Sequence, residues 1–177
     1  MDIELDLCAQ PSSVRDVDWD VVYADQLPRV YNYFRYRVDD DALAEDLTAT
    51  TFEKAWRARK RYRRDRAAFS TWLFTIARNV ATDYYRRRRP VVPLSGLSQR
   101  AAGTSVEETV QGRDDLARLG VLLAGLRPRE RELVSLKYGA GLTNRSIAKL
   151  TGLSESNVGT ILYRVVRRLR AQWEQSL

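Results

Sequence analysis

The chain of 177 residues contains no histidine and a single cysteine, Cys8. Without histidine it cannot form a Ser-His-Asp triad, a Cys-His pair or a His-ligated metal site, so many classes of enzyme are excluded. A lone cysteine forms no internal disulfide and no cysteine-rich zinc site, which fits a reducing cytoplasm. The sequence also lacks a run of ~18 apolar residues, so no membrane insertion is expected. We therefore predict a soluble, cytoplasmic protein without a cofactor.

Charge is distributed unevenly, although 30 Lys and Arg against 23 Asp and Glu give a net charge of +7. Residues 1–53 hold 4 basic and 13 acidic side chains, whereas residues 54–89 hold 13 basic and 2 acidic ones. Residues 90–115 are mildly acidic, and residues 116–177 carry +7. Two basic blocks separated by an acidic segment indicate two surfaces that bind a polyanion, and nucleic acid is the leading candidate.

Apolar residues recur at three- and four-residue spacing, and no useful strand-like alternation occurs, so an all-α fold is predicted. The first helix should cover 18–38, with a kink or restart at Pro28. The second should begin at the aspartates of 39–41 and end near 57, before a loop within 57–68. The third should start near Thr71, capped by Ser70 with a staple between flanking phenylalanines, and end before Pro90.

Four segments follow from this pattern: a tail over 1–17, a helical domain over 18–89, a linker over 90–115 and a second helical domain over 116–177. The linker is rich in Pro, Gly, Ser and Thr, with a short helical turn expected near Glu107. The second domain should begin with a leucine-spaced helix and continue with one that starts at Pro128 and ends near Tyr138. Helices over 144–150 and 155–172 complete it.

The last two helices have the spacing of a helix-turn-helix. Small Ala148, turn residue Gly152 and apolar Val158 stand where such a motif needs them, and Thr143 and Ser154 can cap the two helices. Four arginines follow within the second helix, which favours binding in a DNA major groove over an ordinary helical hairpin.

A second pattern is WLFTIARNVATDYYRRRR, residues 72–89, in which aromatic and arginine residues alternate along a helix. Aromatic side chains stack on unpaired bases, arginines hold phosphates, and Asn79 and Asp83 can contact base edges. The alternative is that Trp72, Phe74 and Tyr84 belong to the core.

A third pattern is the group of carboxylates within 39–46, which could form a two-metal nuclease site. This interpretation is weaker than a solvated helix start, because the carboxylates of such nuclease sites usually come from separate elements.

The segment AEDLTATTFEKAW, the helix over 72–89 and the terminal helix-turn-helix together resemble the extracytoplasmic-function group of bacterial RNA polymerase sigma factors. The resemblance covers about 18–89 and 116–171. It implies a non-enzymatic initiation factor whose N-terminal domain binds the clamp helices of core polymerase and melts the −10 element. The C-terminal domain would bind the polymerase flap and recognise the −35 element. An anti-sigma factor is a further candidate partner.

By motif, the resemblance implies three sets of site residues. The polymerase-binding set is Asp46, Leu47, Phe52 and Trp56. The −10 set is Arg61, Tyr62, Arg63, Arg64, Arg66, Trp72, Asn79, Asp83 and Arg86. The −35 set is Ser156, Asn157, Thr160 and Arg164.

The chain departs from the family pattern at two places. Ala49 and Thr50 follow the Asp-Leu pair where many members have Gln-Glu, and Gly159 and Ile161 replace long cations in the recognition helix. The main alternative function is a free-standing helix-turn-helix regulator that binds duplex DNA without polymerase, and the second is a metal-dependent nucleic-acid enzyme.

Overall fold

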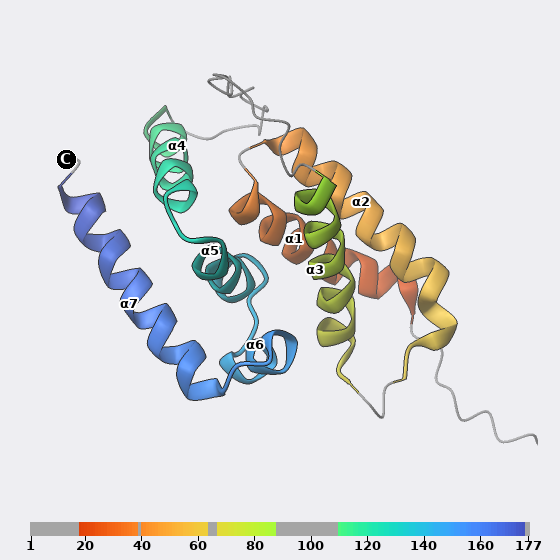
Figure 1. Cartoon of the computed structure of the whole chain (residues 1–177). Coiled ribbons are helices and arrows are strands. Elements are labelled where there is room, and N and C mark those ends of the chain that lie inside the picture. Colours follow the sequence, from red (N-terminus) through yellow and green to blue (C-terminus); the bar gives the residue numbers. More distant parts are fainter. Residues whose placement is uncertain (1–17, 39, 64–66, 88–109, 176–177) are drawn as a thin grey trace, which may run out of the picture.

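The computed structural model describes residues 18–38, 40–63, 67–87 and 110–175 (Figure 1). Every regular element within these ranges is helical, which confirms the all-α prediction. Two short elements interrupt the α-helices: a 3₁₀ turn, η1, and a π-helical turn, η2. The elements are α1 (Trp19–Arg37), α2 (Asp41–Ala58), η1 (Arg59–Arg61), α3 (Phe69–Arg87), α4 (Val110–Ala124), α5 (Pro128–Val134), η2 (Ser135–Gly139), α6 (Asn144–Thr151) and α7 (Glu155–Glu174).

Helices α1, α2 and α3 form the N-terminal half, and α2 packs on both of the others. Their shared interior contains apolar side chains from each helix, including Val30, Phe34, Ala44, Leu73 and Val80. These recur at helical spacing, so each helix presents one apolar stripe to the others. Burying one such large side chain contributes about 1.5–3 kcal/mol relative to leaving it exposed.

The start of α2 follows the sequence expectation. The Asp40 carboxylate accepts a hydrogen bond from the Leu43 backbone N at 3.1 Å, so it caps the helix. Asp41 lies in the first turn and pairs with Arg35 of α1. Asp39 lies outside the described residues.

Two local expectations need correction. Helix α1 continues through Pro28 without a restart, while a kink at this proline stays a prediction. Helix α3 begins at Phe69, not near Thr71, because the Ala68 carbonyl already accepts a hydrogen bond from the Trp72 N at 3.1 Å. Ser70 therefore lies inside the first turn and is not the N-cap. Fully buried Phe74 belongs to the core rather than to a staple around that cap.

The C-terminal half contains the predicted helix-turn-helix in α6 and α7. The Thr143 hydroxyl accepts from the Ser146 N at 3.1 Å, and the Ser154 hydroxyl accepts from the Asn157 N at 3.2 Å. Gly152 ends α6 in the left-handed conformation, with φ of 73°. Glycine adopts this conformation without the steric cost of a Cβ atom, so it allows the tight turn between the two helices.

Helix α4 starts at Val110, within the segment that the sequence assigned to the linker. The expected turn near Glu107 and the rest of the segment up to 109 lie outside the described residues. Towards its end α4 places Leu123 in the core. Arg118 of the same helix lies over the ring of Trp173 in α7, 4.3 Å from its centroid, which ties α4 to the end of the chain.

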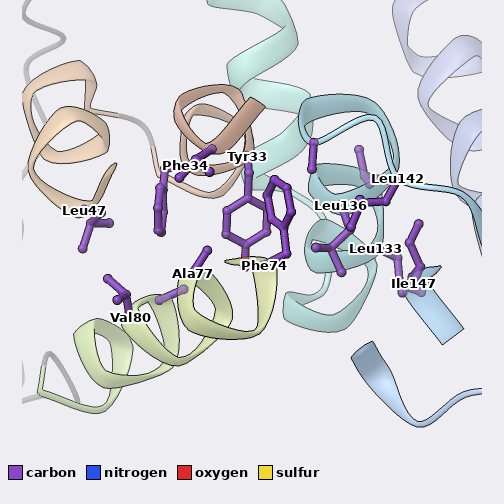
Figure 2. Packing of buried hydrophobic residues seen from close by; sticks show 14 of the residues in the cluster. Tyr33, Phe34, Leu47, Phe74, Ala77, Val80, Leu133, Leu136, Leu142 and Ile147 are labelled. Atoms are coloured by element: carbon purple, nitrogen blue, oxygen red, sulfur yellow. The ribbon is translucent and has the colours of Figure 1, made fainter. Parts of the chain in front are cut away.

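The two halves share one hydrophobic core (Figure 2). Helix α1 packs along η2 and contacts α5, while α3 contacts α6 (Figure 1). At this junction the rings of Tyr33 and Phe74 lie next to each other and beside Leu133 and Leu136 of the C-terminal half (Figure 2). The helix-turn-helix is therefore packed against the N-terminal helices.

We expect Ile147→Ala to lower the free energy of unfolding by about 2–5 kcal/mol, because Ile147 is fully buried and its removal leaves a cavity. Urea denaturation followed by circular dichroism measures the change. Leu153→Ala is a suitable control, since Leu153 is only partly buried in the turn. A loss for Ile147→Ala no larger than for this control would contradict the core position.

Candidate nucleic-acid interface

A cluster of aromatic rings lies where the start of α1, the end of α2 and the start of α3 meet. The ring of Trp19 lies 5.4 Å from Trp56, 5.7 Å from Phe69 and 6.4 Å from Trp72, in edge-to-face arrangements. Tyr62, in the segment after η1, lies 5.2 Å from Trp72. Edge-to-face ring contacts of this kind are favourable beyond simple area burial. The cluster thus fixes Tyr62 on the helical core.

One part of this aromatic cluster is open to solvent. Trp56 is 50% exposed, and the guanidinium of Arg59 lies over its ring at 3.9 Å from the centroid. Trp72 and Tyr62 are half-buried. An exposed indole face beside cations is the combination that holds unpaired bases and phosphates in single-strand binding proteins.

A basic depression lies along the end of α2, lined by Lys54, Arg57, Ala58 and Arg61. Arg57 forms an ion pair with Glu53 at 2.5 Å on the exposed surface, a geometry that contributes little to stability. The remaining cations give the depression a positive potential beside the aromatic cluster. This potential favours a polyanion.

The predicted −10 residues on α3 lie along its exposed side. Asn79 and Arg86 are exposed, whereas Asp83 is half-buried. The Asp83 carboxylate accepts from Arg86 at 3.3 Å and lies 3.7 Å from Lys54 Nζ. Asp83 therefore already holds two cations in place, and its structural role is to orient them.

The rest of the −10 set is only partly described. Arg61 and Arg63 are exposed, and the Tyr62 hydroxyl donates to the Ala67 carbonyl at 3.2 Å. Arg64 and Arg66 lie outside the described residues. The structure thus brings the end of α2, the residues after η1 and the start of α3 together, while Asn79, Asp83 and Arg86 follow along α3.

The predicted polymerase-binding residues divide into two groups. Leu47 and Phe52 are buried in the N-terminal core, and Phe52 lies 4.7 Å from the ring of Tyr23. In the free chain these two side chains stabilise α2 from the core, and their part in polymerase binding stays a prediction. Asp46 and Trp56 lie on the surface of the same helix.

All four predicted −35 residues on α7 are exposed: Ser156, Asn157, Thr160 and Arg164. Opposite them, Val158, Leu162 and Val165 are buried against the core, so α7 presents its other side to solvent. The Thr160 hydroxyl donates to the Ser156 carbonyl at 3.0 Å and keeps only acceptor capacity for another group.

The two unusual recognition-helix residues do not lie on this exposed side. Ile161 is partly buried and packs against the core. A Cβ at Gly159 would lie 3.5 Å from the side-chain amide nitrogen of Asn144 at the start of α6. Ile161 therefore contributes to packing, and a methyl group at Gly159 would make only an ordinary van der Waals contact with α6.

Sequence patterns alone missed four residues of these surfaces. Trp19 and Phe69 join the aromatic cluster, and Arg59 covers Trp56. Tyr163 is 64% exposed on α7, with the Arg167 guanidinium 5.7 Å from its ring centroid. A helical wheel places Tyr163 on the side of Thr160 and Arg164, so its position on this surface could have been predicted from the sequence.

Two of the carboxylates that suggested a metal site, Asp40 and Asp41, have other partners. As described above, Asp40 caps α2 and Asp41 pairs with Arg35. No group of three or more His, Cys, Asp or Glu residues that would hold a metal ion occurs within 18–38, 40–63, 67–87 and 110–175. In the same ranges, no helix is long and apolar enough to cross a membrane.

Comparison with known proteins matches the two halves separately. The model of the Sigma-70 region 2 family matches residues 22–91, and that of the Sigma-70, region 4 family matches residues 116–169. The ECF RNA polymerase sigma factor BldN of Streptomyces coelicolor is 34% identical over 79% of this chain, which spans about half (54%) of BldN. The RNA polymerase sigma factor CarQ of Myxococcus xanthus is 32% identical, and the match covers 84% of this chain and 85% of CarQ. The chain belongs to the ECF sigma factors of the sigma-70 family.

Its function is therefore that of a sigma factor, which directs RNA polymerase to promoters and initiates transcription, and not that of a free-standing regulator. A solved structure supports the fold independently. The sigma factor RpoE of Bartonella quintana, in complex with the anti-sigma factor NepR, superimposes with a TM-score of 0.69 at 21% identity. The superposition covers 89% of this chain and 97% of that one.

One ion pair ties α5 to the recognition helix α7. Glu130 Oε2 accepts from Arg168 at 2.7 Å and from the Arg127 backbone N at 3.2 Å. The hydrogen bond from Arg168 holds the pKa of Glu130 below its usual value, against a smaller opposing effect of burial. A carboxylate with a lowered pKa stabilises the fold above its ordinary pKa, and this contribution is lost as pH falls through the lowered value.

We expect Glu130→Gln to destabilise the protein at neutral pH and to have a smaller effect as pH falls below the ordinary pKa of 4.5. The unfolded chain becomes protonated at that pKa first, and the folded carboxylate follows only at its lowered pKa. Urea midpoints of both proteins, measured from pH 7 down to pH 3, test this expectation. A difference between the two proteins that does not change with pH would mean that the ion pair contributes nothing to stability.

Proposed function

We propose that the N-terminal half of this sigma factor binds core polymerase through α2 and holds the melted −10 strand beside α3, while α7 recognises the −35 duplex. The observation that carries the proposal is the placement of two exposed, cation-rich surfaces on separate halves of the chain. One surface contains aromatic rings, as expected for unpaired bases. The other is a capped recognition helix, as expected for a major groove.

The −10 surface is supported by the aromatic cluster and the basic depression together. Tyr62 and Trp72 offer partly exposed rings for stacking, and the depression along α2 offers cations for phosphates. Asn79 on the exposed side of α3 has an amide that pairs with a base edge. Phosphate contacts would position the strand, and base contacts would give the specificity.

For polymerase we assign Asp46 and Trp56, the exposed members of the predicted set on α2, with Leu47 and Phe52 supporting them from the core. The clamp helices are the expected contact of this half, and the flap that of the C-terminal half. The factor itself is not an enzyme and acts in the cytoplasm with the polymerase. An anti-sigma factor is a further proposed partner, as in the solved complex of RpoE with NepR.

For the −35 element we assign Asn157, near the start of α7, to base recognition and Arg164, two turns further on, to phosphate. Asparagine pairs through both amide atoms with adenine N6 and N7 in the major groove. Tyr163 and Arg167 extend this surface along the exposed side of α7. The Tyr163 ring provides apolar contact with the sugar-phosphate backbone or a thymine methyl group.

Asn79→Ala should impair open-complex formation and alter base preference in the −10 element, at a cost of about 1–3 kcal/mol, because one base contact is lost. Permanganate footprinting of the melted strand measures this. Thr82→Ala is a matched control, since Thr82 is exposed on the same helix and its hydroxyl donates to the Arg78 carbonyl. Equal loss of core polymerase binding would show instead that Asn79 is structural.

Asn157→Ala should relax specificity at one −35 position, whereas Arg164→Ala should weaken binding to all sequences and reduce its salt dependence. Selection of −35 variants with each mutant holoenzyme, repeated at two salt concentrations, separates these effects. An unchanged consensus for Asn157→Ala, or a changed one for Arg164→Ala, would overturn the assignment.

A further inference from the structure

Helices α2 and α3 lie side by side, and one carboxylate joins their exposed sides (Figure 1). One oxygen of Asp83 in α3 lies 3.7 Å from Lys54 Nζ of α2, and the other accepts from Arg86 Nη2 at 3.3 Å. The pair with Lys54 connects two helices, whereas the pair with Arg86 lies within α3. Asp83 therefore brings cations from two separate elements to one point of the surface.

Both cations remain open to solvent. The side chains of Lys54 and Arg86 are 47% and 73% exposed, and that of Asp83 is 37% exposed. Lys54 Nζ is too far from the carboxylate for a close hydrogen bond, and the guanidinium of Arg86 has more donors than the one that Asp83 accepts from. Each cation thus keeps donors for a second anion on the solvent side.

The two cations follow Asn79 along the surface of α3. Asn79, Asp83 and Arg86 are separated by four and three residues, so they lie on one side of the helix. At a rise of about 1.5 Å per residue, Asp83 lies roughly 6 Å from Asn79 along the helix axis. An anion bound by Lys54 and Arg86 therefore lies beside the base that Asn79 is proposed to contact.

Lys54 also belongs to the basic depression at the end of α2, which it lines together with Arg57, Ala58 and Arg61. The depression and the exposed side of α3 thus form one cationic surface, and Lys54 is shared between its two parts. A nucleic-acid strand carries a phosphate at every nucleotide. A strand that crosses this surface from the depression to Asn79 passes Lys54 on its way.

A carboxylate beside a phosphate site has two opposite effects on binding. Its charge repels the phosphate, which weakens binding. Its contacts with Lys54 and Arg86 hold two long side chains in place, which lowers the entropy cost of ordering them when the strand binds. The second effect is the larger one here, because both side chains are long and exposed, whereas the charge of Asp83 is screened from the strand by the two cations.

We propose that Lys54 and Arg86 together bind one backbone phosphate of the melted −10 strand, beside the base at Asn79, and that Asp83 is their positioning residue. The inference rests on the proposed −10 function of this half and adds to it a phosphodiester site formed by two helices. It also predicts the sign of an effect. Loss of the negative charge of Asp83 weakens strand binding, although charge alone predicts a gain.

Binding of holoenzyme to a promoter with an unpaired −10 region tests the site. The promoter is first obtained by run-off transcription of genomic DNA, and the unpaired strand is then made with one neutral methylphosphonate at each position in turn. We expect a position next to the base sensed by Asn79 at which this change lowers the affinity of wild type. Lys54→Met and Arg86→Met should each bind the unmodified strand about fivefold more weakly, the upper value for one exposed ion pair, and should lose the response at that position alone.

Asp83→Asn tests the positioning role. It should bind the unmodified strand about threefold more weakly than wild type and respond less to the methylphosphonate at the same position. A residue that only stabilises the fold does not produce this pattern, because a general loss of structure reduces binding whichever phosphate is replaced. The effects of Lys54→Met and Asp83→Asn should be less than additive, since each disrupts the same contact.

Two substitutions provide matched controls. Glu53→Gln also removes one carboxylate beside the depression, but Glu53 pairs with Arg57 of its own helix and joins no second element through that pair. It should bind the strand at least as tightly as wild type. Lys60→Met removes an exposed cation of η1 that forms no ion pair with Asp83 in the described part of the chain. It should retain the response at the phosphate next to Asn79.

The possible results separate this site from the proposed function. Tighter binding by Asp83→Asn, or an equal loss at every phosphate position, would overturn the positioning role. A changed base preference in Asp83→Asn with an unchanged phosphate response would make Asp83 a base contact instead. A response of Lys54→Met identical to that of Lys60→Met would overturn the phosphate site. The proposed −10 function fails separately, if Asn79→Ala leaves the base preference in the −10 element unchanged.

Discussion

The approach of η2 to the backbone of α1 is the contact on which the rest of this molecule depends. Because Gly139 has no side chain, the turn comes within van der Waals distance of Asn32 and Tyr33. That approach brings the leucines of α5 and η2 over Tyr33 and Phe74, and it places Glu132 between two arginines. Two separate small domains would each have only a modest core. Here both halves of the chain contribute side chains to one core.

The arginines of this chain serve two purposes that only their surroundings distinguish. Arg29, Arg78 and Arg131 donate to carbonyl or carboxylate oxygens across the contact between the halves. Arg61 and Arg164, by contrast, lie exposed on the surfaces proposed to bind nucleic acid. Guanidinium groups suit both tasks because they present several donors in a fixed plane. A net charge therefore overstates the number of cations available to a polyanion.

The aromatic residues are likewise divided between the interior and the candidate surfaces. Spacing predicted correctly that α3 has a buried stripe, but it left open which rings belong to the core. The structure buries Phe74 completely and leaves Trp72 half-buried at the surface cluster, where Trp19 of α1 and Trp56 of α2 arrive from other parts of the chain. No local pattern within residues 72–89 contains that information, since the neighbours of a ring are set by packing between helices.

Local rules predicted most of what is local. Side-chain caps at Asp40, Thr143 and Ser154, the left-handed turn at Gly152 and the helical class of every described element follow from short-range sequence signals. They do so because caps and turns depend on residues within one helical turn. The start of α3 was missed because Ser70 is a good cap by type, whereas Ala68 already closes the first turn.

By itself the sequence determined the helices, the helix-turn-helix and, through motif resemblance, the sigma-factor family, since these depend on residue order and spacing. Only the tertiary structure decided that Leu47 and Phe52 are core residues, that Ile161 packs against the core, that Trp19 joins the aromatic cluster, and that the two halves pack together. Those outcomes depend on contacts between residues far apart in the chain, such as Arg78 with Glu132, and a spacing pattern carries no information about which helices meet.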